Sequence, residues 1–383
     1  MQDGAVARTI ARVSERFAGA GFAPVEVPVL LPMEDFVRIS GEEFRRRMFV
    51  TTDGRGVERC LRPEFTIPVC RKAVATGIAG DAVRFSYSGQ IFRNGRAGES
   101  DEVWQMGGEL IGRHDPAGAD AEILALALDI ARDNGVSAPQ VTIGDVGLFA
   151  ALLDALALPA AWKRRLMTQF GDPRKVRETV RHMHAPASGF AQFSPHADVI
   201  KALSEFPSER VGELFADILS IAGIQSVGGR TTSEIAERVL EQATLAAETV
   251  MPAGATDIVD AFLDLELPLA EAADKLKSHA LMAGADKGAL AAAIARFEAR
   301  IDAFQASGIA LDNVTFSASF GRRLGYYDGF VFDITDPRAA GLGQVCGGGR
   351  YDALMTSFGA PADVKAVGFA VWTERLAGLE ASS

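Results

Sequence analysis

The sequence predicts an α+β fold in which an antiparallel sheet is flanked by helices. Polar and apolar side chains alternate along residues 82–93 and 102–112, which is the two-residue period of strands with one polar face. From about Asp115 the apolar residues change to a helical period, and residues 147–305 are almost entirely helix-like and rich in alanine. We therefore expect one core, made of residues 1–146 and 306–383, interrupted by a mainly helical insertion and return helix over residues 147–305.

The N-terminal residues predict a helix followed by a strand. Val6, Ile10, Val13 and Phe17 recur on one stripe, which indicates a helix over residues 5–20 that ends at the following glycines. The stretch from Pro24 to Leu31 is typical of a strand, because its prolines stand at positions that an edge strand tolerates.

The next stretches predict the polar inner face of the sheet. Within residues 60–73, Arg62, Glu64 and Thr66 share one side and apolar residues share the other. This alternation indicates an extended segment at the lip of a pocket. In residues 102–112, Gln105, Gly107 and Glu109 project together, and so they are expected to line the same pocket.

The remaining elements are expected to complete the sheet and cover it. A helix over residues 119–134 is closed by Gly135, and a last helix begins near Trp372. The pattern predicts further strands at residues 141–146, 314–320, 329–334 and 341–348.

Composition narrows the class of protein. The 383 residues carry a net charge of −11, which disfavours a nucleic-acid binder because such proteins usually present a basic face. Three cysteines, none in a CxxC pair, indicate a reduced protein. Neither a long apolar run nor the pattern of a signal peptide is present, and we expect a cytoplasmic protein without membrane contact.

Several motifs together resemble one enzyme family. Leu61-Arg-Pro-Glu-Phe-Thr66 and the segment from Arg322 to Asp333 resemble the segments that hold histidine in histidyl-tRNA synthetases. Two further segments, Gly89 to Arg93 and Trp104 to Gly112, together resemble motif 2 of class II aminoacyl-tRNA synthetases. The segments from Gly347 to Asp352 and from Thr373 to Leu376 resemble motif 3 of that class. Order and spacing hold throughout, so the set is specific although each motif alone is weak. The resemblance implies a class II synthetase-like core.

The resemblance also implies a histidine pocket, and the residue types suit that ligand. The α-amino group needs acceptors such as Glu64, and the carboxylate needs a guanidinium. Glu109 can accept from the imidazole, while tyrosines can hydrogen-bond to the ring and pack against it. The implied histidine-binding residues are Glu64, Thr66, Arg93, Gln105, Glu109, Arg322, Tyr326, Tyr327 and Tyr351.

These residues also have ordinary structural interpretations. Glu109 could be a buried carboxylate paired with an arginine, Tyr326 and Tyr327 could be core residues, and Arg62 suits a structural ion pair. Gly347, Gly348 and Gly349 would let the backbone approach a bound ligand. The close pair His182 and His184 lacks nearby residues with metal-ligand spacing, so no metal site is expected.

The sequence departs from the synthetase pattern where ATP would bind. In the loop after Arg93, Gly95 replaces an acidic residue of the family, and a later arginine is missing. Glu99, Asp101 and Glu102 stand in this loop, where they would repel a triphosphate.

Two further departures lie outside that loop. Trp372 stands where the family has a glycine beneath the adenine, and Gly325 replaces the usual aspartate of the histidine segment. Because Arg93, Arg322 and Arg375 remain, use of ATP stays open. One hypothesis is therefore an amino-acid-activating ligase that adenylates histidine, and another is a dimeric scaffold with an inactive pocket.

The hypothesis that fits best is a regulatory subunit. The sequence ends soon after Arg375, where a histidyl-tRNA synthetase continues into an anticodon-binding domain. It thus resembles the regulatory subunits of ATP phosphoribosyltransferase, which carry the synthetase core without that domain. The resemblance implies no catalytic residue and no cofactor in this chain, with L-histidine as a feedback ligand. It also implies that a homodimer of this chain joins a short-form catalytic subunit in a hetero-oligomer, which catalyses the first step of histidine biosynthesis. No tRNA partner is implied.

Overall fold

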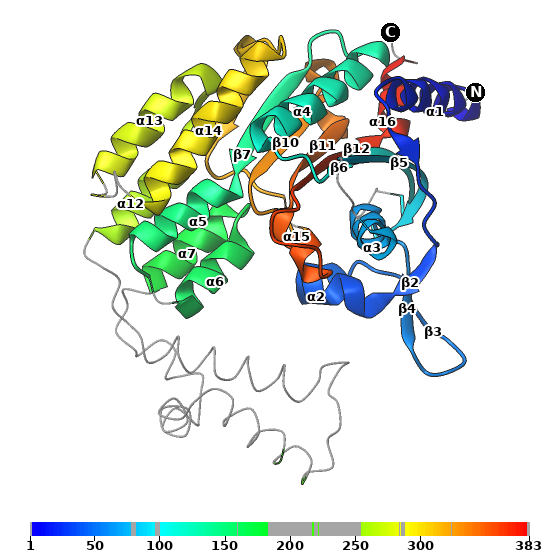
Figure 1. Cartoon of the computed structure of the whole chain (residues 1–383), viewed down its shortest axis with the longest axis horizontal. Coiled ribbons are helices and arrows are strands. Elements are labelled where there is room, and N and C mark those ends of the chain that lie inside the picture. Colours follow the sequence, from blue (N-terminus) through cyan, green and yellow to red (C-terminus); the bar gives the residue numbers. More distant parts are fainter. Residues whose placement is uncertain are drawn as a thin grey trace.

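The computed structural model describes residues 2–77, 82–95, 100–158, 160–182, 254–282, 288–322 and 324–380, together with residues 217, 221 and 284. Within these residues a nine-stranded sheet forms the centre of the protein (Figure 1). Pairing is antiparallel except between β1 and β5 and between β7 and β9, which confirms the predicted sheet and adds two parallel pairs near its edges. The strands lie in the order β1 (Ala23–Pro24), β5 (Val83–Phe92), β6 (Glu102–Ile111), β12 (Ala366–Trp372), β11 (Cys346–Arg350), β10 (Phe330–Thr335), β7 (Gln140–Asp145), β9 (Val314–Ser317) and β8 (Glu266–Pro268).

One face of the sheet is apolar and packs against helices. Phe17 contacts Phe369 of β12, and Phe304 contacts Phe330 of β10, with ring centroids 5.6 Å apart in both pairs. Burial of these rings supplies much of the driving force for folding, because it removes large apolar areas from water. The helices on this side are α1 (Gln2–Gly19), α4 (Pro116–Asp133), α5 (Val146–Ala155), α14 (Ala289–Ala306) and α16 (Thr373–Glu380), and α1 and α16 lie side by side (Figure 1).

The opposite face of the sheet carries polar side chains, as the alternation in β6 predicts. A methyl group added at Gly368 of β12 would overlap the carboxylate of Glu109, whereas one at Gly108 would meet the ring of Phe17. Glu109 and Phe17 therefore lie on opposite faces. The elements over the polar face are α2 (Met33–Arg45), α3 (Thr66–Thr76), α15 (Asp352–Ser357) and a small sheet of β2 (Leu30–Pro32), β4 (Glu58–Leu61) and β3 (Val50–Thr52).

Residues 60–73 are not one extended segment, and that expectation was wrong. Strand β4 ends at Leu61, and helix α3 begins at Thr66. Pro68 lies in the first turn of this helix, where proline is tolerated. In consequence Glu64 and Thr66 stand at the start of a helix rather than along a strand.

The helical part of the chain contributes to the sheet as well. Its described helices are α5, α6 (Ala160–Gln169), α7 (Pro173–His182), α12 (Ala255–Leu263), α13 (Leu269–Met282) and α14. Strand β8 also lies within residues 147–305 and pairs with β9, so the stretch is not purely helical. The strand expected at residues 341–348 begins only at Cys346, after a 3₁₀ helix over Pro337–Leu342. Most of residues 183–253 lie outside the described residues.

A buried ion network joins α14 to the sheet. Arg300 on α14 donates to Asp120 of α4 and to Asp145 of β7, both at 2.7 Å. Arg350 of β11 donates to the second oxygen of Asp120 at 2.6 Å and to Asp352 at 2.9 Å. Because Asp120 is almost fully buried, its carboxylate depends on both guanidinium groups.

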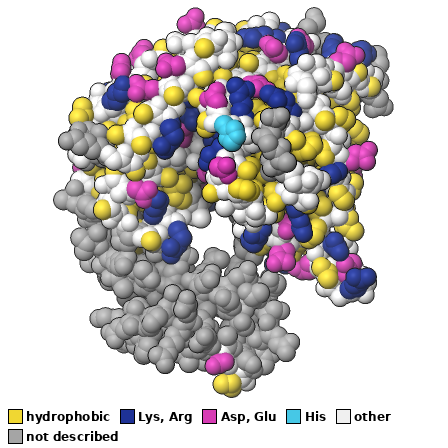
Figure 2. Space-filling model, in the orientation of Figure 1, with side chains coloured by type: hydrophobic (Ala, Val, Ile, Leu, Met, Phe, Trp, Pro, Cys, Tyr) yellow, Lys and Arg dark blue, Asp and Glu magenta, His cyan; other side chains and the backbone are white. Residues whose placement is uncertain are grey.

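The surface is of mixed charge. On the face shown in Figure 2, acidic and basic side chains are interspersed with apolar ones over the described residues. None of the described helices combines the length and the apolar character that crossing a membrane requires.

Candidate functional site

The site begins at the first turn of α3. The carboxylate of Glu64 accepts hydrogen bonds from the backbone N–H groups of Thr66 at 2.7 Å and Ile67 at 2.9 Å. These are donors that a helix leaves free at its N-terminus, and so the sequence Glu-Phe-Thr places a carboxylate there. Glu64 is buried, and burial raises its pKa to about 7 although both hydrogen bonds oppose the rise.

Glu109 on β6 is the second buried carboxylate. The hydroxyl of Tyr351 donates a hydrogen bond to its Oε2. Its Oε1 is buried and has no hydrogen-bond partner in the part of the chain that the structure describes. Burial raises the pKa of Glu109 to about 8, because the hydrogen bonds from neighbouring hydroxyls only partly offset the loss of water. A buried acceptor without a donor is costly, and an N–H group of a ligand would remove that cost.

Three tyrosines form a cluster of rings, and one of them, Tyr351, holds this carboxylate. The rings of Tyr326 and Tyr327 lie 4.6 Å apart, and that of Tyr351 stands edge-on to them at 5.8 and 6.3 Å between centroids. Gly325, just before the pair, has a φ of +78° and lies against the backbone carbonyl of Ile39 on α2. A side chain there would meet that carbonyl, so the aspartate of the family pattern does not fit this backbone.

Two arginines border the cluster. Arg93, just after β5, donates to the carbonyl of Pro63, and its guanidinium lies over the ring of Phe44. Burial lowers the pKa of Arg93 to about 10, against the attraction of Glu64. Arg322 donates to Asp333 of β10, while its buried Nε lacks a partner among the described residues. Burial alone would lower the pKa of Arg322, but Asp333 and the tyrosines raise it above its usual value.

The predicted site residues therefore come together from distant parts of the chain. Thr66 follows Glu64 at the start of α3, and its hydroxyl contributes to lowering the pKa of Glu109. Gln105 is buried on β6, four residues before Glu109 and on the same face. Register places Gln105 opposite Trp372 and Glu109 opposite Gly368 on β12.

Sequence reasoning missed three members of the cluster. Tyr87 of β5 is buried, and its hydroxyl occupies the space that a side chain at Gly107 would fill. Cys70 stands one turn after Thr66, and burial followed by the charge of Glu109 raises its pKa. Asp333 holds Arg322. Once α3 is seen as a helix, the spacing of four residues from Thr66 would have indicated Cys70.

Two expectations about neighbouring residues need correction. The space beside Gly347 holds the guanidinium of Arg322 and the carboxylate of Asp333, so this glycine admits an ion pair of the protein rather than a ligand. Arg62 makes no ion pair among the described residues. It donates to the carbonyls of Val27 and Gln90, at 2.8 and 2.9 Å, and stacks on Phe65.

The region where the synthetase pattern is lost is filled by side chains. The indole of Trp372 has two guanidinium groups over its ring, with the guanidinium carbon of Arg322 at 5.6 Å and that of Arg375 at 5.3 Å from the ring centroid. Asp101 closes the loop after β5 by accepting from the backbone N–H of Gly95 at 2.7 Å. Glu99 lies outside the described residues.

This arrangement suits a small zwitterion with an additional N–H donor. Two buried carboxylates offer acceptors for an ammonium group and for a ring N–H. Two arginines offer donors for a carboxylate, and the tyrosine rings offer a wall for a flat side chain. Among the described residues no group of His, Cys, Asp and Glu has an arrangement that could hold a metal ion.

The chain matches a known family over most of its length. The family model described as histidyl-tRNA synthetase matches residues 2–212 and 211–376. A protein of Brucella anthropi named ATP phosphoribosyltransferase regulatory subunit is 38% identical over 354 residues, which cover 92% of each chain. The protein of the same name from Brucella canis is 38% identical over 359 residues, or 93% of this chain and 92% of that protein.

Solved structures support the fold. A structure from Bacillus halodurans, titled an ATP phosphoribosyltransferase regulatory subunit/histidyl-tRNA synthetase, superimposes with a TM-score of 0.66 at 20% identity. The alignment covers 98% of this chain and 79% of that one. A histidine–tRNA ligase subunit from Alicyclobacillus acidocaldarius superimposes with a TM-score of 0.62 at 24% identity. That alignment covers 99% of this chain and 94% of the other chain. At these identities the likeness establishes the class II synthetase-like fold.

Proposed function

The chain belongs to the family of ATP phosphoribosyltransferase regulatory subunits with a histidyl-tRNA synthetase-like core, and from that premise we propose that it binds L-histidine for feedback control. In this proposal it joins a short-form catalytic subunit in the first step of histidine biosynthesis, in the cytoplasm. It supplies no catalytic residue, requires no cofactor and binds no tRNA. Its net charge of −11 and the mixed charges in Figure 2 support the absence of a tRNA partner.

The unpartnered Oε1 of Glu109 is the observation that carries the proposal. A buried acceptor is normally satisfied, and in this proposal a bound molecule supplies the donor. An imidazole N–H fits, because a cluster of tyrosine rings lies beside the carboxylate and Glu64 lies in the same cluster to receive an ammonium group. This favours histidine over an aliphatic amino acid, which has no ring donor.

The surroundings of Trp372 support a regulatory rather than a catalytic role. Its indole lies close to the guanidinium groups of Arg322 and Arg375, at 5.6 and 5.3 Å, so a large ring of the protein stands beside both cations. Arg322 is also paired with Asp333. A ligase would need cations free to neutralise a triphosphate during adenylation.

The proposal includes a homodimer built on the N-terminal region. Val29 and Leu30, between α1 and α2, are 44% and 46% exposed, which is high for large apolar side chains. Beside them a groove of about 670 Å³ runs along α3 and is lined by Val27, Pro28, Leu31 and Ile67 among others. A second copy of the chain would cover these apolar residues.

Mixing the full chain with a short-form catalytic subunit tests the proposed function. Phosphoribosyl-ATP synthesis is expected to appear or rise strongly on mixing, and L-histidine is expected to suppress it. The same preparation is assayed for histidine-dependent exchange of pyrophosphate into ATP. Exchange well above a control without protein would favour the histidine-activating ligase. A catalytic subunit that is fully active alone and does not co-elute with this chain would refute the regulatory role.

A further inference from the structure

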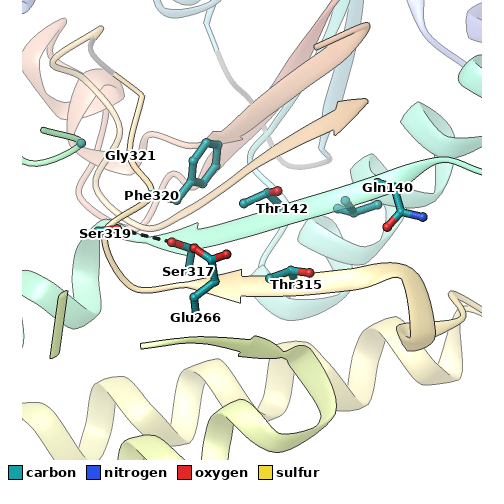
Figure 3. Close-up of a pocket in the computed structure, with 10 residues that line it drawn as sticks. Gln140, Thr142, Glu266, Thr315, Ser317, Ser319, Phe320 and Gly321 are labelled. Atoms are coloured by element: carbon teal, nitrogen blue, oxygen red, sulfur yellow. Dashed lines mark hydrogen bonds between the residues drawn. The ribbon is translucent and has the colours of Figure 1, made fainter. Parts of the chain in front are cut away.

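A second cavity lies on the polar face of the sheet, at its far edge. It has a volume of about 470 Å³, within the range of small-molecule sites. Figure 3 shows its floor, formed by β7, β9 and β8, and Phe320 from the segment that follows β9. Thr142 pairs with Thr315, and Ser317 pairs with Glu266, so register points these four side chains to one side of the sheet.

The lining of this cavity is rich in hydroxyl groups. Thr142, Thr315, Ser317 and Ser319 each supply one. The hydroxyls of Ser317 and Ser319 are 3.4 Å apart, and either of them can be the donor. Whichever donates, the other hydroxyl proton of this pair stays free for a ligand. Ser317 is only 7% exposed, so its hydroxyl has little access to bulk water.

The charges of the lining narrow the class of ligand. Glu266 supplies a carboxylate and Gln140 an amide, whereas none of the ten lining residues is lysine or arginine. Phosphate and carboxylate groups are usually bound by cations, so the cavity does not suit an anion. Phe320 adds an apolar wall. Hydroxyls beside a carboxylate suit a vicinal diol, since a carboxylate accepts hydrogen bonds from ribose hydroxyls in dinucleotide-binding proteins.

We propose that the cavity formed by β7, β9, β8 and Phe320 binds the unphosphorylated ribose ring of a pentose or nucleoside. Thr142 and Ser317 contact the ring hydroxyls, Glu266 accepts from the vicinal diol, and Phe320 covers the apolar side of the ring. The cavity adjoins the Glu64–Glu109 cluster, because Thr142 pairs with Asp333, but it has its own lining residues. The proposal does not rest on the proposed binding of histidine.

Ligand-observed NMR on the full chain, with D-ribose and uridine as probes, tests the proposal. Both probes are expected to show saturable binding, and 2-deoxyribose and 2′-deoxyuridine are expected to bind about tenfold more weakly, because one hydroxyl of the diol is missing. Tighter binding of uridine than of ribose identifies a nucleoside, and equal binding identifies the pentose. Absence of saturable binding by ribose and by uridine overturns the proposal.

Variants then locate the site. Thr142→Val keeps a β-branched side chain on β7 but removes the hydroxyl, and is expected to weaken uridine binding about tenfold. Thr51→Val makes the same change on exposed β3 of the other sheet and is expected to leave binding unchanged. Glu266→Gln is expected to reduce the preference for uridine over 2′-deoxyuridine. Equal binding by the wild type and Thr142→Val, or tighter binding of uridine 5′-monophosphate than of uridine, overturns the assignment.

Discussion

The hydroxyl of Tyr351 donates to one oxygen of Glu109, and the other oxygen of this carboxylate is buried without a partner among the described residues. The two residues come from β6 and from the residue before α15, more than two hundred positions apart in sequence. The phenol thus fixes the orientation of the carboxylate and leaves one oxygen available. A site in this state is prepared for a single directional donor.

Glu109→Gln tests whether that oxygen recognises histidine. The substitution keeps the size of the side chain but replaces a charged acceptor with a neutral amide. We expect the affinity for L-histidine to fall at least about tenfold, because hydrogen bonds to charged groups contribute about 1.5–3 kcal/mol. Isothermal titration calorimetry measures the change, and Glu271→Gln on exposed α13 is the matched control. An unchanged affinity, or equal thermal shifts with leucine and histidine, would show that the pocket assignment is wrong.

The two buried carboxylates predict an unusual dependence on pH. Burial raises the pKa of Glu64 to about 7 and that of Glu109 to about 8, from a usual value near 4.5. Between about pH 4.5 and the raised pKa values, the folded state binds more protons than the unfolded state. The two protonated carboxyl groups therefore stabilise the fold at low pH, and this stabilisation is lost as pH rises through about 7 and 8. Without ligand, the melting temperature is expected to fall from about pH 6 to about pH 8.5.

Histidine should oppose that loss. Its ammonium group and ring N–H favour the ionised carboxylates, so binding releases protons and the ligand-induced thermal shift grows over the same pH range. Calorimetry in buffers of different ionisation enthalpy measures the protons released. The Glu109→Gln variant should release fewer. A thermal shift that is constant from about pH 6 to about pH 8.5 would contradict the role of these carboxylates.

All four tyrosines of the chain lie at this one site, which makes them specific reporters. Burial raises the pKa of Tyr87, Tyr326, Tyr327 and Tyr351 above the usual value. In a titration followed by tyrosinate absorbance, the folded protein should show almost no ionisation at about pH 10, whereas the protein in urea titrates normally. With 3-fluorotyrosine labelling, histidine should shift several of the four resonances. Unshifted resonances under saturating histidine would place the ligand elsewhere.

Asp120→Asn should destabilise the protein strongly. The change removes the charge that Arg300 and Arg350 share in a buried environment. Leaving buried charges without their partner costs about 3–5 kcal/mol. Urea unfolding measures the loss, and Asp129→Asn on the exposed side of the same helix should change the free energy of unfolding by less than about 1 kcal/mol. Similar effects of the two substitutions would contradict the importance of the network.

The strands and their faces were predictable because a period of two is a direct signature of a half-buried sheet. Gln105, Gly107 and Glu109 share the polar face as the sequence indicates. The start of α3 was not predictable from alternation, because Pro68 fits both a strand edge and a first helical turn. The side chains that complete the site, such as Tyr87 and Cys70, depend on which elements meet above the sheet, and one sequence does not encode that proximity locally. The histidine assignment and the domain boundaries stay predictions.

The position of Arg300 limits how this chain can be shortened. It belongs to the stretch from 147 to 305 by sequence, yet its two carboxylate partners, Asp120 and Asp145, belong to the sheet domain. Excising the whole stretch would therefore leave Asp145 without its arginine in the remaining core, and would leave Asp120 with Arg350 alone. A deletion confined to residues 183–253 keeps Arg300, Asp120, Asp145 and Arg350 together, and so a minimal version of the protein has to retain α14.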